Sequence, residues 1–492
     1  MEAARILVQR PHVVLYGDQA LLELGARRAA HLDQLVGPYS RNGFHHPGPT
    51  VFYLLAPFVR LLEPVGPGLY LGAVVLNAAA LIAVVAVVWR RVGPAAAAWA
   101  AAAIDLFCLL LGVGTLREPW NPYLVIAPML LFVVLWAVGR TGSVTAAIWS
   151  VVVGSYEMQT HLATAPFVIV MSVILGVGLF RKRDNDRGRA WPGLLVLAMI
   201  WLVPVIELVR DRPNNVSLMW DFFTSSHAAT PVGKAVDAAT GAISIVPFGN
   251  HDYVIALHRS PWEVVMAAAL LVVGALVALR RNAHPLSRAL VAAATLATVI
   301  GTLSLAGADG PVFSYYAVWL AVVPVAVLLA LVPAVPGRAR WPLAALCVLV
   351  AALAVVSDLR TPPISRTTGS GPWPLDQAVS LQGKRQTIRD TVALTDAVEG
   401  ALRPSDHVVG FTIGTTAVWP FVAGVVLQLD QRGVQSTVGP AGWELYFGHE
   451  RAPGRAVNVA FTLDLAGAPV DPRQTVVAEI DGTVLTAIRA RG

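Results

Sequence analysis

The ionisable side chains of the N-terminal part are concentrated in residues 16–60. Asp18 stands near the start of this stretch, and Arg41, His45 and His46 lie further along it. A positioned carboxylate can act as a general base, and a guanidinium is a forked, permanently charged donor suited to phosphate. The combination therefore predicts a site that removes a proton from one substrate and binds a phosphate on another.

Taken alone, Asp18 has a simpler interpretation as a helix N-cap, because residues 19–30 have a helical pattern and aspartate is a favoured cap. On such a helix Glu23 would pair with Arg27 four residues later, which makes Glu23 a solvated salt-bridge partner. The presence of Arg41 and two histidines in the same segment favours a chemical role for Asp18.

His45 and His46 are followed by Pro-Gly-Pro, which forms a rigid turn. The turn presents its polar groups where the chain enters an apolar, aromatic sequence. One interpretation is a helix start with interfacial aromatic residues. The other is a phosphate site at the depth of lipid headgroups, formed by Arg41 with His45 or His46.

Two further candidate sites come later in the chain. Glu118 and Asn121 lie in the motif REPWNP, where Glu118 either binds an ion or acceptor or belongs to a tight proline turn. Glu157 and His161 lie where two apolar runs meet, and ionisable groups at membrane depth are costly to bury. They are therefore functional candidates, with a hydrogen bond between the two as the main alternative.

The elements that must position these residues are mainly apolar. Of the 492 residues, 56% are hydrophobic and 13% are charged, whereas soluble domains have about 25% charged residues. This composition predicts a polytopic membrane protein. Cys108 and Cys347 both lie in apolar runs, so no disulfide framework is indicated. The basic residues do not gather on one domain and no nucleic-acid motif is present, which excludes a nucleic-acid partner.

Ten apolar runs are candidate membrane spans. They lie near residues 69–89, 95–116, 123–138, 143–157, 161–180, 191–209, 261–279, 288–306, 313–333 and 341–357. The passage 49–62 is interrupted by Pro57 and Arg60, which is more typical of a helix in the membrane interface than of an eleventh span. Residues 6–15 have the character of the end of a span, so we expect one further transmembrane helix upstream, with an N-terminus that starts on the outer side as the alternative.

The basic residues follow the positive-inside pattern. They recur in alternate loops, whereas the short loops between these hold only Arg117. The alternation places the basic loops in the cytoplasm and residues 1–68, 210–260 and 358–492 outside it. This pattern indicates a multi-pass plasma-membrane protein whose polar first segment and C-terminal domain are extracytoplasmic.

The chain divides into four parts. Residues 1–68 form a first extracytoplasmic loop with interfacial helices, and residues 69–357 form a transmembrane domain. Residues 358–375 are a linker rich in Pro, Gly, Ser and Thr, and residues 376–492 are a small extracytoplasmic α/β domain. The outer loop 210–260 is long enough to form a lid over a site.

The C-terminal domain alternates helical and strand-like patterns. Residues 376–402 and 417–431 are predicted to be helical, whereas 406–413, 456–465 and 474–488 are strand-like. It contains no Gly-rich phosphate loop, metal-spaced cysteine pair or nucleophile elbow. Its role is acceptor recognition or structural capping, two alternatives that the sequence leaves open.

The segments GDQALLEL and PYSRNGFHHPGPTVFYLLAP, with the later WNP motif, resemble the GT-C superfamily of integral-membrane glycosyltransferases. The resemblance is to uncharacterised actinobacterial members with an HPGP signature and, more distantly, to protein-mannosyl and aminoarabinose transferases. It implies a GT-C-like helical fold and a polyprenyl-phosphate sugar donor. It also implies an acidic catalytic residue in the first outer loop, and Asp18 occupies that place.

The resulting hypothesis is an inverting glycosyltransferase that passes a sugar from a polyprenyl-phosphate donor to an envelope glycan, lipid or protein. Asp18 is the general base, and Arg41, His45 and His46 hold the phosphate. The remaining candidates for substrate contacts are Glu118, Asn121, Glu157 and His161.

The hypothesis leaves open whether a divalent metal ion takes part. It also has two rivals. One is a transporter or flippase of lipid-linked glycans, which should show internal repeats, and none is visible in the sequence. The other is a non-catalytic envelope assembly factor, in which the C-terminal domain binds partners and the membrane part is a scaffold.

Overall fold

The structure is a computed structural model of the chain. It describes residues 2–63, 66–111, 113–180, 190–225, 229–244, 261–310, 312–331 and 381–489, with short pieces at 333, 349–353 and 356. The linker predicted at 358–375 lies outside these residues. So do most of the apolar run 341–357 and part of the outer loop 210–260.

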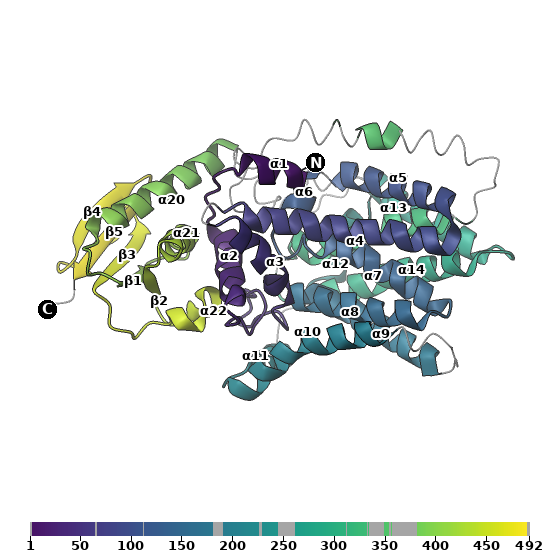
Figure 1. Ribbon diagram of the computed structural model, residues 1–492, viewed down its shortest axis with the longest axis horizontal. Helices are drawn as coiled ribbons and strands as arrows, with labels where there is room; N and C mark the ends of the chain where they lie inside the picture. The colour runs from purple at the N-terminus through teal and green to yellow at the C-terminus, as the bar shows by residue number, and fades with distance from the viewer. Residues whose placement is uncertain are drawn as a thin grey trace.

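The first segment consists of three short helices, α1 (Glu2–Gln9), α2 (Gly17–Ala30) and α3 (Thr50–Leu61). A helical bundle follows (Figure 1). Its elements are α4 (Gly68–Val92), α5 (Pro94–Leu111), α6 (Val113–Arg117), α7 (Ile126–Arg140), α8 (Val144–Thr160), η1 (Leu162–Thr164), α9 (Ala165–Phe180), α10 (Trp191–Arg210), α11 (Asn215–Thr224), α12 (Val232–Ile243), α13 (Pro261–Leu279), α14 (Pro285–Ala306), α15 (Ser314–Ala317), η4 (Val318–Ala321) and α16 (Val322–Leu331).

Five helices of the described part are long and apolar enough to cross a membrane. They are α4, α5, α10, α14 and the continuous segment Ser314–Leu331. Shorter apolar helices accompany them, among them α3 and α7. These helices indicate a membrane protein. The count of ten or eleven spans remains a prediction.

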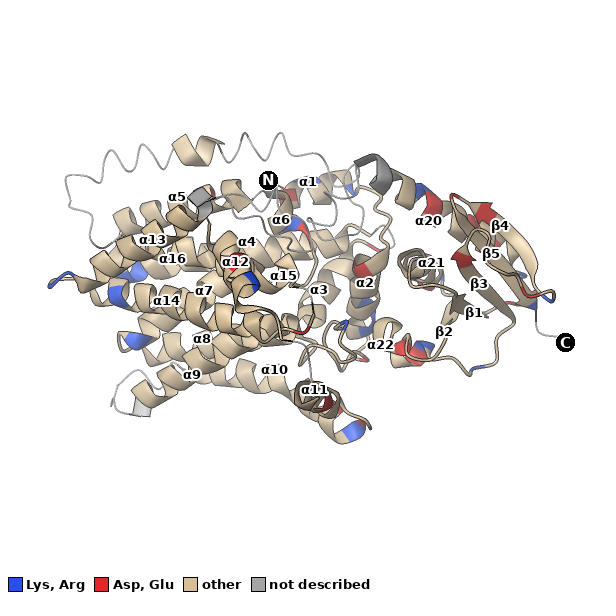
Figure 2. Cartoon of the chain, turned by 180° about the vertical axis from the view of Figure 1, so that it is seen from behind, with Lys and Arg blue, Asp and Glu red and all other residues tan. Residues whose placement is uncertain are grey.

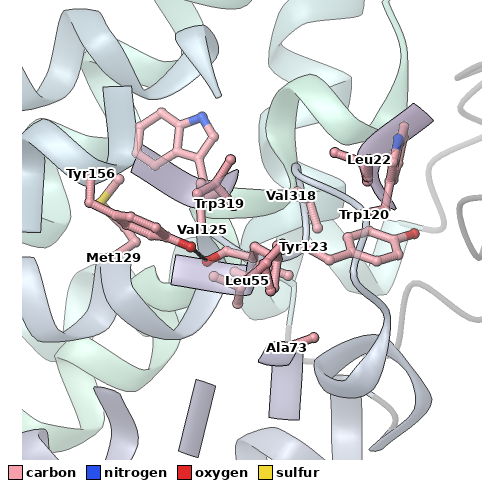
Figure 3. Packing of buried hydrophobic residues seen from close by; sticks show 14 of the residues in the cluster. Leu22, Leu55, Ala73, Trp120, Tyr123, Val125, Met129, Tyr156, Val318 and Trp319 are labelled. Atoms are coloured by element: carbon pink, nitrogen blue, oxygen red, sulfur yellow. Dashed lines mark hydrogen bonds between the residues drawn. The ribbon is translucent and has the colours of Figure 1, made fainter. Parts of the chain in front are cut away.

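Helix α7 forms the centre of the bundle, because nearly every residue from Ile126 to Gly139 is buried. It packs against α4, α8, α14 and α16. Figure 3 shows part of this core, where Trp120 and Tyr123 lie among residues of the first segment and Trp319. The bundle thereby gives the segments at its end a closely packed base.

Charged residues are distributed unevenly over the molecule. Figure 2 shows a bundle that is almost free of them along its length, with basic segments at the end farthest from the C-terminal domain. Acidic and basic residues are mixed in the C-terminal domain and at its junction with α2. The apolar length between two polar ends is the arrangement that a bilayer requires.

The C-terminal domain is a mixed five-stranded sheet with helices. Its elements are α20 (Leu381–Ala401), β1 (Val408–Ile413), α21 (Trp419–Gln431), β2 (Gln435–Gly439), α22 (Glu444–Phe447), η7 (His449–Arg451), β3 (Val459–Leu465), β4 (Thr475–Ile480) and β5 (Thr483–Arg489). The strand order is β2-β1-β3-β5-β4. Strand β1 runs parallel to β2 and β3, whereas β5 runs antiparallel to β3 and β4.

The strand-like residues 474–488 form the hairpin β4–β5, in which Ile480 pairs with Thr483. The turn residues Asp481 and Gly482 both have positive φ, 37° and 79°. An Asp-Gly pair is a strong signal for such a two-residue hairpin turn. Strand β2 lies outside the segments that were strand-like in sequence.

Helix α2 joins the two parts of the molecule. Figure 1 shows it between the C-terminal domain and the bundle, and most of its residues from Gly17 to Ala29 are buried despite its polar sequence. Arg27 forms ion pairs at 2.8 Å with both Glu63 and Asp430, and Arg28 pairs with Glu450 at 2.9 Å. Helix α2, which has Asp18 in its first turn, is therefore fixed from both sides.

Candidate active site

A cavity of about 1410 Å³ lies where the first segment, the end of the bundle and the C-terminal domain meet. Its walls include six of the eight candidate residues: Asp18, Arg41, His45, His46, Asn121 and His161. Glu118 and Glu157 are not among the residues that line it. The carboxylate and the arginine predicted to act together thus share one cavity.

Asp18 occupies the first turn of α2, where Tyr16 rather than Asp18 is the N-cap residue. Its carboxylate accepts hydrogen bonds from the Tyr39 hydroxyl and the Trp120 side chain. Burial raises the pKa of Asp18, and the two hydrogen bonds oppose that shift because they stabilise the ionised form. The arrangement gives a carboxylate with a raised proton affinity, as a general base requires.

Tyr39 connects Asp18 to the C-terminal domain. Its ring lies 4.5 Å from the ring of Tyr446, centroid to centroid, at an interplanar angle of 50°. Trp419 approaches the same ring at 6.5 Å. An aromatic cluster from two distant parts of the chain therefore surrounds the hydroxyl that binds Asp18.

The turn at His45 is held by Asn215, the first residue of α11. The Asn215 side chain accepts a hydrogen bond from the His45 N–H at 2.7 Å and donates one to the His45 carbonyl at 2.9 Å. The Asn215 N–H in turn donates to the Glu207 carboxylate at 2.6 Å. The described part of the outer loop is thus packed against the turn at this point.

The close packing of the turn explains why position 48, between two prolines, is a glycine. A Cβ atom at Gly48 would lie 2.4 Å from the side-chain oxygen of Gln159, and one at Gly37 would lie 2.6 Å from the Gly48 carbonyl oxygen. Any side chain larger than hydrogen would displace these groups. Glycine at both positions lets the turn approach α8 closely.

The two histidines of the turn are neutral. His45 donates through Nε2 to the Leu445 carbonyl at 2.8 Å, and burial lowers the pKa of His45 to about 3. His46 accepts the Leu162 N–H at Nδ1, 3.1 Å away, and burial likewise lowers its pKa well below the usual value. The expected cationic turn therefore has Arg41 as its permanent charge, while His46 retains Nε2–H as a neutral donor.

Arg41 projects over an aromatic ring. Its guanidinium lies 4.3 Å from the centroid of Phe313, a cation–π contact. Arg210 and Arg212, at the end of α10, line the same cavity. Sequence reasoning passed over these two residues, although an Arg-Asp-Arg sequence directly after a predicted span was a usable signal.

His161 lies close to His46, with ring centroids 5.3 Å apart. Its Nε2 donates to the Tyr315 carbonyl at 3.1 Å. Both carboxylate oxygens of Glu157 are buried without a hydrogen-bond partner in the described part of the chain, so the alternative of a hydrogen bond between the two side chains is wrong.

The REPWNP motif is divided between two environments. Asn121 lines the cavity and donates to the Thr160 carbonyl at 3.0 Å. Glu118 instead accepts a hydrogen bond from the Gln19 amide, behind the cavity wall. The two residues therefore differ in their access to a substrate.

Within the described residues, no three His, Cys, Asp or Glu side chains come together in an arrangement that could hold a metal ion.

The fold is similar to that of solved membrane transferases. Its structural neighbours are structures of ArnT, an aminoarabinose transferase of the GT-C superfamily. The chain superposes on ArnT from Cupriavidus metallidurans bound to undecaprenyl phosphate with a TM-score of 0.57 and 15% identity. The apo form gives 0.56 and 14%, and in both cases the match covers 99% of this chain and 96% of the other.

At this identity the similarity concerns the fold, and it confirms the resemblance inferred from the sequence at that level. No protein-family model matches the chain, and no curated protein matches it. The activity must therefore be argued from the site.

Proposed function

We propose that the protein is a membrane glycosyltransferase. It transfers a sugar from a polyprenyl-phosphate donor to a cell-envelope glycan, lipid or protein on the extracytoplasmic side of the plasma membrane. The observation that carries this proposal is the single cavity shared by Asp18 and Arg41 at one end of an apolar bundle. The overall similarity to a transferase solved with undecaprenyl phosphate supports it.

Asp18 acts as the general base. Its carboxylate takes the proton of an acceptor hydroxyl while the hydroxyl oxygen attacks the anomeric carbon of the sugar. The bond between that carbon and the phosphate oxygen breaks, and its electron pair leaves with the polyprenyl phosphate. One displacement of this kind inverts the anomeric configuration. A positioned base of this type contributes about 10²–10⁴-fold to the rate.

Arg41 stabilises the departing phosphate. The phosphate gains negative charge as the sugar leaves, and a forked guanidinium over the Phe313 ring stabilises that charge. The Nε2–H of His46, which lines the same cavity, supplies a neutral donor. Arg210 and Arg212 line the same cavity and add positive charge where a lipid headgroup would enter.

The cavity also has a wall suited to the lipid part of the donor. Ile169, Leu218, Phe222 and Trp319 contribute apolar surface to it. Helix α10, which carries Arg210 at its end, exposes many of its hydrophobic side chains, including Leu195, Met199 and Leu202. An isoprenoid chain would lie against this apolar side while its phosphate reached the arginines.

Purified full-length protein in lipid nanodiscs provides the test. Undecaprenyl-phosphate-linked pentoses, hexoses and aminopentoses with labelled sugars are incubated with an envelope extract. The proposal predicts release of undecaprenyl phosphate in step with covalent labelling of the extract for at least one sugar. In sealed vesicles without acceptor, movement of intact labelled lipid across the bilayer, with no transfer in the first assay, would identify a flippase instead.

A further inference from the structure

The C-terminal domain supplies part of the wall that surrounds Asp18. Glu444, Leu445 and Tyr446, which belong to α22, line the cavity. The first segment holds α22 through hydrogen bonds from His45 to the Leu445 carbonyl and from Arg28 to the Phe447 carbonyl, at 2.8 and 2.7 Å. Helix α22 is therefore fixed next to the proposed base.

Tyr446 is the residue of α22 with the most direct connection to the base. Its ring is 4.5 Å from the ring of Tyr39, and the Tyr39 hydroxyl donates to Asp18. Burial, followed by the nearby charge of Asp18, raises the pKa of the Tyr446 hydroxyl. The ring contact thus places Tyr446 beside the Tyr39–Asp18 pair, and the direction of the pKa shift agrees with that position.

Tyr39 depends on such a contact because its own segment is irregular. Residues 31–49 contain neither helix nor strand. Among the described residues, an isolated antiparallel β-bridge between Tyr39 and His45 lies in this segment. A half-buried side chain on a loop loses rotamer freedom only if neighbours restrict it. Tyr446 supplies a large, rigid surface for this purpose, and Trp443, 5.0 Å from Tyr446, supports that ring in turn.

We propose that Tyr446 is a positioning residue for the general base: its ring holds Tyr39 in the orientation in which the Tyr39 hydroxyl donates to Asp18. The inference rests on the transferase function proposed above. It gives the C-terminal domain a part in catalysis, because a residue more than 400 positions away in sequence controls the state of Asp18.

The physical consequence concerns the proton affinity of Asp18. Burial favours the protonated carboxyl, and the hydrogen bond from Tyr39 favours the carboxylate. If Tyr446 releases Tyr39, the hydrogen bond is lost for part of the time and the pKa of Asp18 rises. Fewer molecules then hold an ionised base at a given pH.

The experiment is an infrared titration of the Asp18 carboxyl band in the full-length protein in nanodiscs. Asp18→Asn identifies the band by its loss. Tyr446→Leu removes the ring but keeps apolar volume that excludes water from Asp18, and Tyr446→Phe keeps the ring. Arg27→Ala is the matched control, because it removes ion pairs of the same domain junction to Glu63 and Asp430 without touching Tyr39.

The proposal predicts an upward shift of the Asp18 midpoint by about one pH unit in Tyr39→Phe and in Tyr446→Leu, as loss of a charge-assisted hydrogen bond implies. Tyr446→Phe and Arg27→Ala should titrate like the unmodified protein. In the double variant Tyr39→Phe/Tyr446→Leu the second substitution should add nothing, because both act through one hydroxyl. A midpoint in Tyr446→Leu equal to that of the unmodified protein, or additive shifts in the double variant, would overturn the proposal.

The titration does not depend on turnover, so the two proposals can fail separately. Full sugar transfer by Asp18→Asn would remove the transferase mechanism, whatever the titration gave. An inactive Asp18→Asn with an unshifted Tyr446→Leu would leave that mechanism standing and remove only the role of Tyr446.

Discussion

The side chain of Asn215 pairs with the backbone of His45 through both its oxygen and its nitrogen, at 2.7 and 2.9 Å. The Asn215 side chain thus makes the pair of hydrogen bonds that the backbone of a neighbouring β-strand would make. It joins the first segment to α11, which begins 170 residues later. This pairing is one of several contacts that hold the His-His-Pro-Gly-Pro turn, with those of His45 to Leu445 and of His46 to Leu162.

Replacing Asn215 should therefore disorder the turn. Asn215→Asp keeps the acceptor for the His45 N–H and loses the donor to the His45 carbonyl, whereas Asn215→Leu loses both. We expect a loss of unfolding free energy of about 1 kcal/mol per hydrogen bond for the leucine variant. The aspartate variant should lose more at neutral pH, because its buried carboxylate faces the His45 carbonyl. Thermal unfolding in nanodiscs measures this, and equal stability of both variants and the unmodified protein would contradict the assignment.

Gly48 should not tolerate a methyl group. Gly48→Ala forces the new Cβ against Gln159, and overpacking of this kind costs about 1–3 kcal/mol. Gly114→Ala is the control, since a Cβ there meets no atom within 4 Å. We expect a lower melting temperature and weaker sugar transfer for Gly48→Ala, and neither change for Gly114→Ala. Equal melting temperatures of the two variants would show that the turn does not pack closely against Gln159.

Arg41 should determine affinity for the phosphate of the donor. Arg41→Ala removes the charge, and Arg41→Lys keeps it without the forked geometry. Binding of undecaprenyl phosphate should weaken by about tenfold or more in the alanine variant, as expected for a charged hydrogen bond, and by less in the lysine variant. Arg60→Ala, at an exposed position of α3, should bind like the unmodified protein. If Arg41→Ala bound undecaprenyl phosphate as tightly as the unmodified protein, Arg41 would not be part of the phosphate site.

Glu23 should make the domain junction sensitive to pH. Its carboxylate accepts a hydrogen bond from Gln431 at 2.8 Å, and burial raises the pKa of Glu23 from 4.5 to about 7. The unfolded chain releases this proton at lower pH than the folded protein does. Stability should therefore fall as the pH rises from 4.5 to 7, by about 3 kcal/mol in total.

Glu23→Gln tests this effect, because it removes the titration and keeps the shape. The variant should melt at a higher temperature than the unmodified protein at pH 8 and at a similar temperature at pH 4.5. A difference of the same size at both pH values would mean that the titration of Glu23 does not contribute.

The sequence brought together residues that line one cavity, and their roles remain predictions. Asp18, Arg41 and His46 were selected because ionisable residues cluster in residues 16–60, and His161 was selected because an ionisable group at membrane depth is costly to bury. The same reasoning also selected Glu157, whose burial away from the cavity depends on the rotation of α8 and is not visible in its local sequence.

Residues that act through long-range contacts were missed. Neither Asn215 nor Tyr446 belongs to a motif that is recognisable in the sequence. The fold brings Asn215 to His45 and Tyr446 to Tyr39. The neutrality of His45 has the same origin, because the residues around Leu445 that help to bury it belong to another domain. Four of the five strands of the C-terminal sheet lie in segments that were strand-like in sequence, whereas β2 does not.

The most direct test of the account is sugar transfer by Asp18→Asn, measured as release of undecaprenyl phosphate per folded molecule. Asp396→Asn, an exposed carboxylate on α20, is the matched control. Loss of a general base predicts a fall in kcat of about 10²–10⁴-fold for Asp18→Asn, with undecaprenyl phosphate binding preserved and the control fully active. Transfer by Asp18→Asn at the rate of the control would contradict the account.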